Sequence, residues 1–163
     1  MPCFETRRQV PFTTLEMFDL VADVERYPEF LPLCEGLRVL SRDGDGNPRT
    51  LVAVMDVGYK AIRESFTSQV TLDRTVPSVR ADLVDGPFNR LINEWSFTDN
   101  GDGCAIRFFI DYEFKSMMLQ LLFGAAFEHA FGRFAEAFEE RAHIIYGRRG
   151  PRVGRQSPSR SRP

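Results

Sequence analysis

The most regular stretch of the chain is residues 104–114, where apolar and polar side chains alternate one by one. The apolar positions are Cys104, Ile106, Phe108, Ile110, Tyr112 and Phe114. A period of two places alternate side chains on opposite faces of a β-strand. The pattern therefore predicts a strand with one buried face and one face toward solvent.

Residues 116–146 follow at once, contain no proline and are rich in helix-forming residues, which predicts one long helix. The first half of this helix, 117–131, is apolar on nearly every side. That half must be enclosed by protein, or its outer side must face a lipid, a ligand or a partner. Its uncharged run at 116–127 is shorter than the ~20 residues that a membrane-spanning helix needs. The second half is amphipathic, with apolar positions at Phe131, Phe134, Ala135, Phe138, Ala142 and Ile145.

Before these elements, residues 3–11 alternate weakly and predict a first strand. Thr13 and Glu16 form the sequence signature of a capping box, which predicts a short helix to about Ala22. Asp23 can cap a further turn, which Pro28 must disturb because proline lacks an N–H donor. Residues 23–37 are therefore predicted to form a bent segment, called the elbow here.

The middle of the chain predicts strands at 37–41, 50–57, 61–72, 79–85 and 88–98, separated by turn residues such as Gly58 and the run 99–103. The predicted order is strand, two short helices, six strands and a long helix. This order is typical of an α+β fold in which helices pack on one side of an antiparallel seven-stranded sheet. We expect the curved sheet to grip the C-terminal helix.

Composition and charge narrow the class of protein. The 163 residues, 43% of them hydrophobic, predict one globular domain over residues 1–146. Three widely spaced cysteines and a polar N-terminus favour a cytosolic chain with free thiols and no signal peptide. Residues 147–163 contain six arginines and no acidic residue, which leaves a net charge of −8 on the rest. Their Arg, Pro, Ser and Gly content predicts a disordered tail.

Most catalytic constellations are missing from the sequence. The run 43–48 begins like a calcium loop but has Pro48 where glycine is required. His129 and His143 lie fourteen residues apart on one helix, too far to share a metal. Glu64 and Asn93 have inward parity among apolar neighbours, so each is expected to form a structural hydrogen bond or to orient a ligand, with acid or base chemistry as the alternative.

Two stretches carry a resemblance to a known family. Residues 18–39 read FDLVADVERYPEFLPLCEGLRV, and residues 85–97 read DGPFNRLINEWSF. Together with the order of elements over residues 3–146, they resemble the coenzyme Q-binding family of the START, or helix-grip, superfamily of polyketide cyclase-like proteins. That family is similar also to the bacterial ribosome-association toxin family. The chain departs from the pattern at Leu33, where we expect Trp in many relatives.

The resemblance implies binding of ubiquinone or a polyprenyl quinone precursor in support of respiration and quinone synthesis, without a cofactor and without established catalysis. Such a carrier is expected in the cytoplasm, with peripheral contact to the inner membrane, and DNA is not an expected partner. Three alternatives stay open. They are a ribosome-associating interaction module, a polyketide cyclase or aromatase-like enzyme with Glu64 as its base, and a domain with a solid core and a protein partner.

We expect the ligand to lie in one apolar cavity of several hundred Å³ between the sheet and the long helix. No residue is assigned to catalysis or to a metal. The residues expected to line or border this cavity are Tyr27, Phe30, Phe66, Trp95, Phe97, Phe108, Tyr112, Leu121, Leu122 and Ala125.

Overall fold

The computed structural model describes residues 3–148 and contains the expected α+β order of elements. The helical elements are α1 (Thr14–Ala22), the 3-10 helix η1 (Val24–Glu29) and α2 (Met117–Tyr146). The strands are β1 (Cys3–Val10), β2 (Cys34–Asp43), β3 (Arg49–Tyr59), β4 (Ile62–Asp73), β5 (Ser78–Asp85), β6 (Phe88–Asp99) and β7 (Cys104–Phe114).

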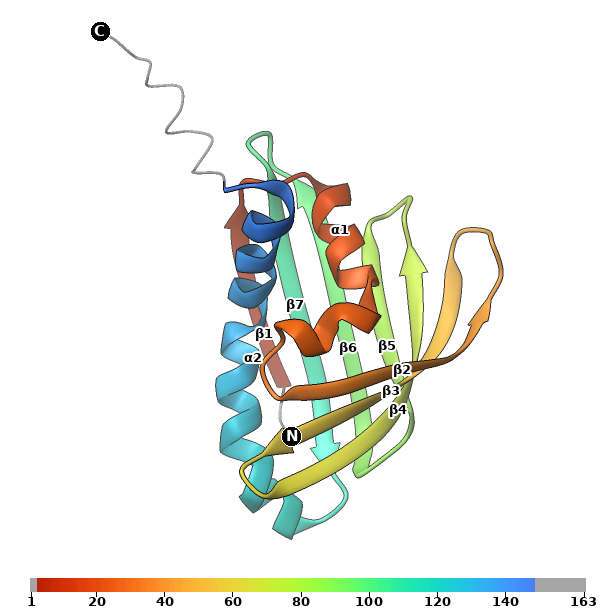
Figure 1. Ribbon diagram of the computed structural model, residues 1–163, viewed down its shortest axis with the longest axis vertical. Helices are drawn as coiled ribbons and strands as arrows, with labels where there is room; N and C mark the ends of the chain where they lie inside the picture. Colours follow the sequence, from red (N-terminus) through yellow and green to blue (C-terminus); the bar gives the residue numbers. More distant parts are fainter. Residues whose placement is uncertain (1–2, 149–163) are drawn as a thin grey trace, which may run out of the picture.

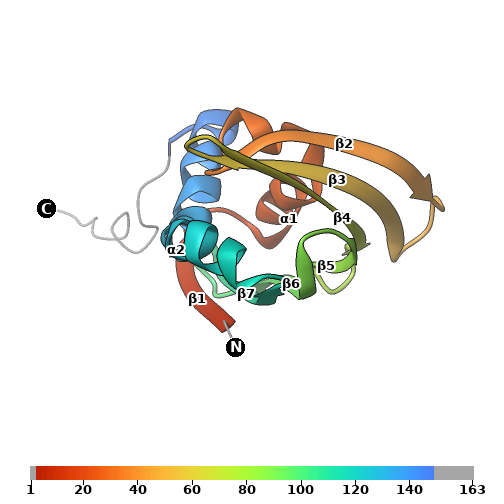
Figure 2. The same cartoon turned by 90° about the horizontal axis from the view of Figure 1, so that it is seen from below.

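The seven strands form one antiparallel sheet in the order β1-β7-β6-β5-β4-β3-β2. Because each strand from β2 to β6 pairs with its successor, strands β2 to β7 form a meander, and β1 pairs with β7 to form one edge of the sheet. Figure 2 shows that the sheet curls, so that β2 and β3 lie across the interior from β6 and β7. The helices α1, η1 and α2 all lie on the concave side (Figure 1).

Local sequence signals account for the helix ends. The Thr13 hydroxyl accepts a hydrogen bond from the Glu16 N–H, and the Glu16 carboxylate accepts one from the Thr13 N–H, which confirms the capping box. The Ser116 hydroxyl caps α2 by accepting from the N–H of Leu119. η1 contains Pro28 and is a 3-10 helix, as expected of a turn that lacks one donor.

The core lies between the concave face of the sheet and the inner side of α2. Every residue of the apolar set predicted on β7 is buried, and the intervening residues are half-buried. Opposite them, α2 presents four buried aromatic rings, those of Phe123, Phe127, Phe131 and Phe138. Edge-to-face contacts join the two layers, for example Tyr112 to Phe131 with ring centroids 5.4 Å apart.

Three local predictions were wrong. The β3–β4 turn is not at Gly58, because pairing continues to Tyr59 and Ile62 and the chain reverses at Lys60, whose φ is 57°. Asp23 makes no side-chain cap to η1. Ile145 is half exposed, because Phe12 and the buried His143 fill the core at that level, with ring centroids 4.9 Å apart.

The predicted tail of residues 147–163 falls almost entirely outside the described residues. Within residues 3–148, no helix is long and apolar enough to cross a membrane. The three cysteines are free thiols, with Cys34 and Cys104 buried and Cys3 exposed.

Candidate functional site

An apolar cavity of about 100 Å³ lies between the concave face of the sheet and α2. Strands β2 to β7 each contribute side chains to its wall. Phe127, Phe131 and Phe134 close it from the helix, while Val24, Tyr27, Pro32 and Leu33 close it from η1 and the rest of the elbow. The space therefore lies where the sequence predicted a ligand site, between the sheet and the long helix.

The cavity exists because small side chains occupy the centre of the concave face. Ala53, Ser68 and Ala81 lie on three adjacent strands, β3, β4 and β5, and all three line the wall. The rings of α2 that line the space also contact β7, so they fill only part of it. Phe108 on β7, for example, lies with its ring centroid 5.6 Å from that of Phe134.

The volume is smaller than the several hundred Å³ predicted. Three phenylalanine rings of α2 point at the wall, and Phe127 and Phe131 also pack on one another with centroids 5.5 Å apart. These rings fill space that a more open groove would leave empty. The cavity is smaller than most small-molecule sites, which range from about 300 to 1,000 Å³.

The structure does not bring the ten predicted site residues together around one space. Tyr27, Phe66 and Phe108 are on the cavity wall. Trp95, Phe97 and Tyr112 are buried in the surrounding core, where Trp95 packs on Phe108 and Phe138. Phe30 lies outside the cavity and borders a surface groove. The remaining three are exposed on the outer side of α2: Leu121, Leu122 and Ala125.

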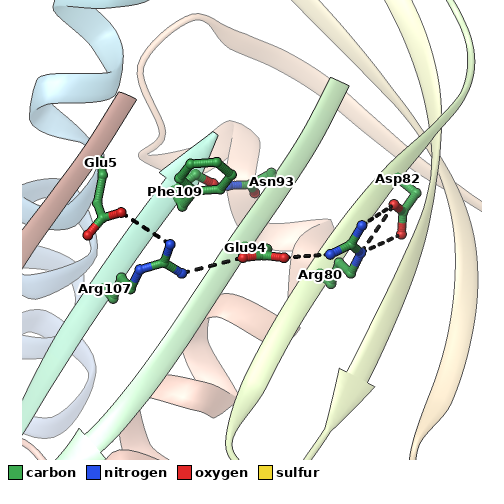
Figure 3. Close-up of polar contacts among 7 residues, drawn as sticks. All are labelled: Glu5, Arg80, Asp82, Asn93, Glu94, Arg107 and Phe109. Atoms are coloured by element: carbon green, nitrogen blue, oxygen red, sulfur yellow. Dashed lines mark hydrogen bonds and ion pairs between the residues drawn. The ribbon is translucent and has the colours of Figure 1, made fainter. Parts of the chain in front are cut away.

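Three polar side chains interrupt the apolar wall. The Tyr27 hydroxyl is already occupied, because it donates to the backbone carbonyl of Val21 and burial raises the pKa of its phenol. Ser68 is 8% exposed. Asn93 lies on β6, and its Nδ2 donates to the backbone carbonyl of Phe109 on β7 at 2.9 Å (Figure 3). The structural hydrogen bond expected for Asn93 is therefore present.

Glu64 and the two buried thiols do not offer a catalytic group to the cavity. Glu64 is half-buried near the β3–β4 turn and is not on the wall. Burial raises the pKa of Cys34 to about 11 and that of Cys104 to about 12, so both thiols are protonated at neutral pH. Among residues 3–148, no group of three His, Cys, Asp or Glu side chains could hold a metal ion.

The elbow separates the cavity from the molecular surface. Pro32 lines both the cavity and a surface groove of about 310 Å³ that runs beside α2. Leu33 has a φ of 70°, an unfavourable backbone conformation for a side chain branched beyond Cβ, and its carbonyl accepts a hydrogen bond from the Gly58 N–H. Pro32 is therefore shared by the cavity wall and the wall of the surface groove.

The start of α2 carries an exposed apolar surface, called the outer patch here. Met117, Met118 and Leu121 are 74%, 68% and 78% exposed, and Leu122 and Ala125 complete the patch. The opposite side of the same turns is buried, with the rings of Phe123 and Phe127 packed edge to face in the core. The outer patch is therefore not enclosed by any part of residues 3–148, whereas Phe123 and Gly124 on the inner side of these turns are enclosed.

The convex face of the sheet is covered by paired charges. A ladder of ion pairs crosses β1, β7, β6 and β5, as Figure 3 shows. Arg107 lies 3.1 Å from Glu5 and 3.4 Å from Glu94, and Glu94 also pairs with Arg80. These arginines and carboxylates neutralise one another, so Arg80 and Arg107 are not free cations on this face.

The family model described as polyketide cyclase/dehydrase and lipid transport matches residues 10–139 of the chain. The ribosome association toxin RatA of Escherichia coli K12 is 36% identical over 150 residues, which are 91% of this chain and 92% of that protein. The mitochondrial coenzyme Q-binding protein COQ10 homolog B of Xenopus laevis is 34% identical over 144 residues, covering 84% of this chain and 56% of that protein.

Solved structures support the same assignment. The solution structure of an 18 kDa protein from Caulobacter crescentus superposes with a TM-score of 0.76 at 34% identity, covering 91% of this chain and all of that one. A START superfamily protein from Mycobacterium smegmatis gives a TM-score of 0.70 at 23% identity, covering 88% and 98% of the two chains. The expected helix-grip architecture is thus confirmed.

Proposed function

We propose that this chain, which belongs to the polyketide cyclase/dehydrase and lipid transport family of START-like proteins, binds ubiquinone or a polyprenyl quinone precursor and carries it to and from a membrane surface. The observation that carries the proposal is the apolar cavity under α2, together with the exposed apolar patch at the start of that helix. The cavity suits the ring of a lipid ligand, and the exposed apolar patch suits contact with the membrane that supplies the lipid. The resemblance to a coenzyme Q-binding protein agrees with this ligand class.

The cavity volume implies that loading requires movement. An apolar cavity of about 150 Å³ holds a single benzene ring, whereas the cavity here measures about 100 Å³. A substituted ring with an isoprenoid chain therefore needs α2 or the elbow to shift outward. Pro32 lines both the cavity and the groove. We propose that the isoprenoid part of the ligand leaves the protein there.

The proposed role is binding rather than catalysis. The described wall holds one phenol, one hydroxyl and one amide, and the phenol already donates to a backbone carbonyl. General acid–base chemistry needs a group that titrates near the working pH within reach of the ligand. Glu64, the residue considered for a cyclase reaction, is off the wall, which supports the carrier over the enzyme.

We propose that the outer patch contacts the bilayer peripherally, on the cytoplasmic side of the inner membrane. Exposed apolar side chains of this kind gain free energy when they enter the interfacial region of a membrane. Lys115 precedes the patch and is exposed, so it can meet lipid phosphate. The arginines of residues 149–163 are expected to add attraction to anionic lipid that weakens with salt.

A transfer assay tests this role. Donor vesicles containing ubiquinone are incubated with acceptor vesicles and the full chain, and quinone in the acceptors is measured over time. Leu121→Glu should slow transfer at least tenfold, because it places a charge in the patch. The matched control is Val76→Glu, at a side chain that is 69% exposed and lies in the turn between β4 and β5, outside both the patch and the groove. Equal transfer by wild type and both variants would contradict the proposal.

Ribosome association is the second candidate, because a relative of which this chain covers 92% is named as a ribosome association toxin. The folded body offers limited support, since most of its arginines are paired with carboxylates, as in the ladder of Figure 3. Contacts to RNA phosphate need unpaired Lys and Arg gathered on one face. Co-sedimentation with ribosomal subunits by the full chain and by a chain ending at Tyr146 distinguishes a body contact from a tail contact. Absence of both chains from the ribosomal fractions would remove this candidate.

A further inference from the structure

Two polar groups on the cavity wall have no hydrogen-bond partner within residues 3–148. One is the Ser68 hydroxyl, on a side chain that is 92% buried, and the other is the Asn93 Oδ1. Asn93 is half-buried and Ser68 is buried, and both line the cavity, so their oxygens can be reached from it. A polar group in an apolar wall is stabilised when a hydrogen-bond partner reaches it. Both groups therefore mark positions where a ligand atom completes a hydrogen bond.

The orientation of the Asn93 amide is set by β7. Its Nδ2 donates to the carbonyl of Phe109 at 2.9 Å (Figure 3), and a carbonyl oxygen cannot accept from Oδ1. This bond fixes which end of the amide is anchored in the sheet and leaves Oδ1 as the free end. The wall thus contributes a fixed acceptor to the cavity.

Ser68 lies on the same concave face, two strands away. Val70, two residues after Ser68, faces Ala81 on β5, which in turn faces Asn93 on β6. Two strand spacings amount to roughly 10 Å, so the two side chains meet different atoms of a ligand. The hydroxyl of Ser68 can donate or accept, whereas Asn93 Oδ1 accepts only.

We propose that this pair selects a ring bearing a free hydroxyl, as in a hydroquinone or a phenolic precursor, over the oxidised quinone. The inference rests on the proposed function, because it assumes that the ring occupies the cavity. A quinone oxygen only accepts, so it leaves Asn93 Oδ1 unpaired even when Ser68 donates to it. A ring hydroxyl donates to Asn93 and so completes the pairing. The protein here discriminates between redox forms without performing a redox step.

Affinity for the two forms of one ligand tests the proposal. The probes are a short-chain dimethoxy-methyl-benzoquinone, its hydroquinone kept reduced under anaerobic conditions, and the dimethyl ether of that hydroquinone. Binding to the full chain is followed by quenching of the single tryptophan, Trp95. We expect wild type to bind the hydroquinone roughly tenfold more tightly than the quinone, which corresponds to about 1.4 kcal/mol. The ether, which has no donor, should bind like the quinone or more weakly.

Two variants assign the effect to its residues. Asn93→Leu should lower affinity for the hydroquinone roughly tenfold and leave the quinone unchanged, which brings the ratio close to one. Ser68→Ala should weaken both forms alike, since the hydroxyl serves either one. If Asn93→Leu fails to fold, the affinities of wild type for the hydroquinone and for its ether still show whether a donor on the ring strengthens binding.

The possible outcomes distinguish failure of this inference from failure of the proposed carrier function. Equal affinity of wild type for hydroquinone, quinone and ether overturns the selection by Asn93 and leaves the carrier role standing. A ratio that persists in Asn93→Leu also overturns it. Absence of binding by every probe overturns both the inference and the proposed ligand class.

Discussion

Phe108 of β7 and Phe134 of α2 pack edge to face with ring centroids 5.6 Å apart, and both line the cavity. This contact joins the sheet to the helix at the edge of the space where a ligand is proposed to bind. Movement of α2 away from the sheet would separate the two rings and enlarge the cavity. The packing that stabilises the fold is therefore also the packing that limits access.

Phe108→Ala tests the contribution of this contact. The side chain is 1% exposed and touches Trp95, Phe131 and Phe134. Its removal should lower the free energy of unfolding by about 3–5 kcal/mol, measured by urea denaturation. Phe109→Ala is the matched control, because this neighbour points to the convex face and is half-buried. Its loss should be about 1 kcal/mol or less, and similar losses for both variants would contradict the assigned core.

Gly86→Ala tests the backbone contact behind the cavity wall. A β-carbon at position 86 would lie 2.5 Å from the β-carbon of Phe66, and the φ of Gly86 is 154°. Phe66 must shift, so we expect a destabilisation of about 1–3 kcal/mol and weaker ligand binding. Gly46→Ala serves as control, because no atom lies within 4 Å of its added β-carbon. An unchanged melting temperature in Gly86→Ala would disprove the close approach.

The lowered pKa of Asp73 predicts a loss of stability in acid. Hydrogen bonds from the side chain of Asn47, and then from Thr75, lower the pKa of Asp73 from 3.8 to about 2. A carboxyl whose pKa is lowered by folding stabilises the protein above its unfolded pKa, and this stabilisation disappears as pH falls from 3.8 to about 2. Asp73→Asn should therefore lose less unfolding free energy than wild type across this range.

The control for this titration is Asp45→Asn, in the β2–β3 loop that also contains Asn47. Asp45 is exposed and has no hydrogen bond to another residue within 3–148. Its variant should follow the wild-type curve of stability against pH. If Asp73→Asn also follows that curve, the hydrogen bonds to Asp73 do not stabilise the fold in solution.

The fold was predictable because its signals are local. The alternation at 104–114 fixed the buried face of β7, and Thr13 with Glu16 fixed the start of α1. Errors occurred where tertiary contacts decide, as at Gly58, where pairing with β4 continues for one residue more. The period of a pattern identifies which residues share a face of a helix or strand. It does not show where the rest of the protein stops covering that face, as it does at Ile145, which is half exposed.

The site was less predictable than the fold. Large aromatic residues were expected around the cavity, but rings such as Trp95 and Tyr112 fill space and lie in the core. The wall owes its space to Ala53, Ser68 and Ala81, whose small size at inward positions is a weak signal in sequence. Curvature of the sheet decides whether such positions leave a hole, and curvature arises from all seven strands together.

Extraction of the purified full chain with organic solvent, followed by mass spectrometry, tests the central claim most directly. The chain is produced in a host that makes quinone, beside Ala81→Phe, which adds a ring to the cavity wall and is checked for folding by circular dichroism. The account predicts an isoprenoid quinone, hydroquinone or polyprenyl precursor in the wild-type extract and little of it in the variant. Equal amounts of such lipids from both proteins, or none from wild type, would contradict it.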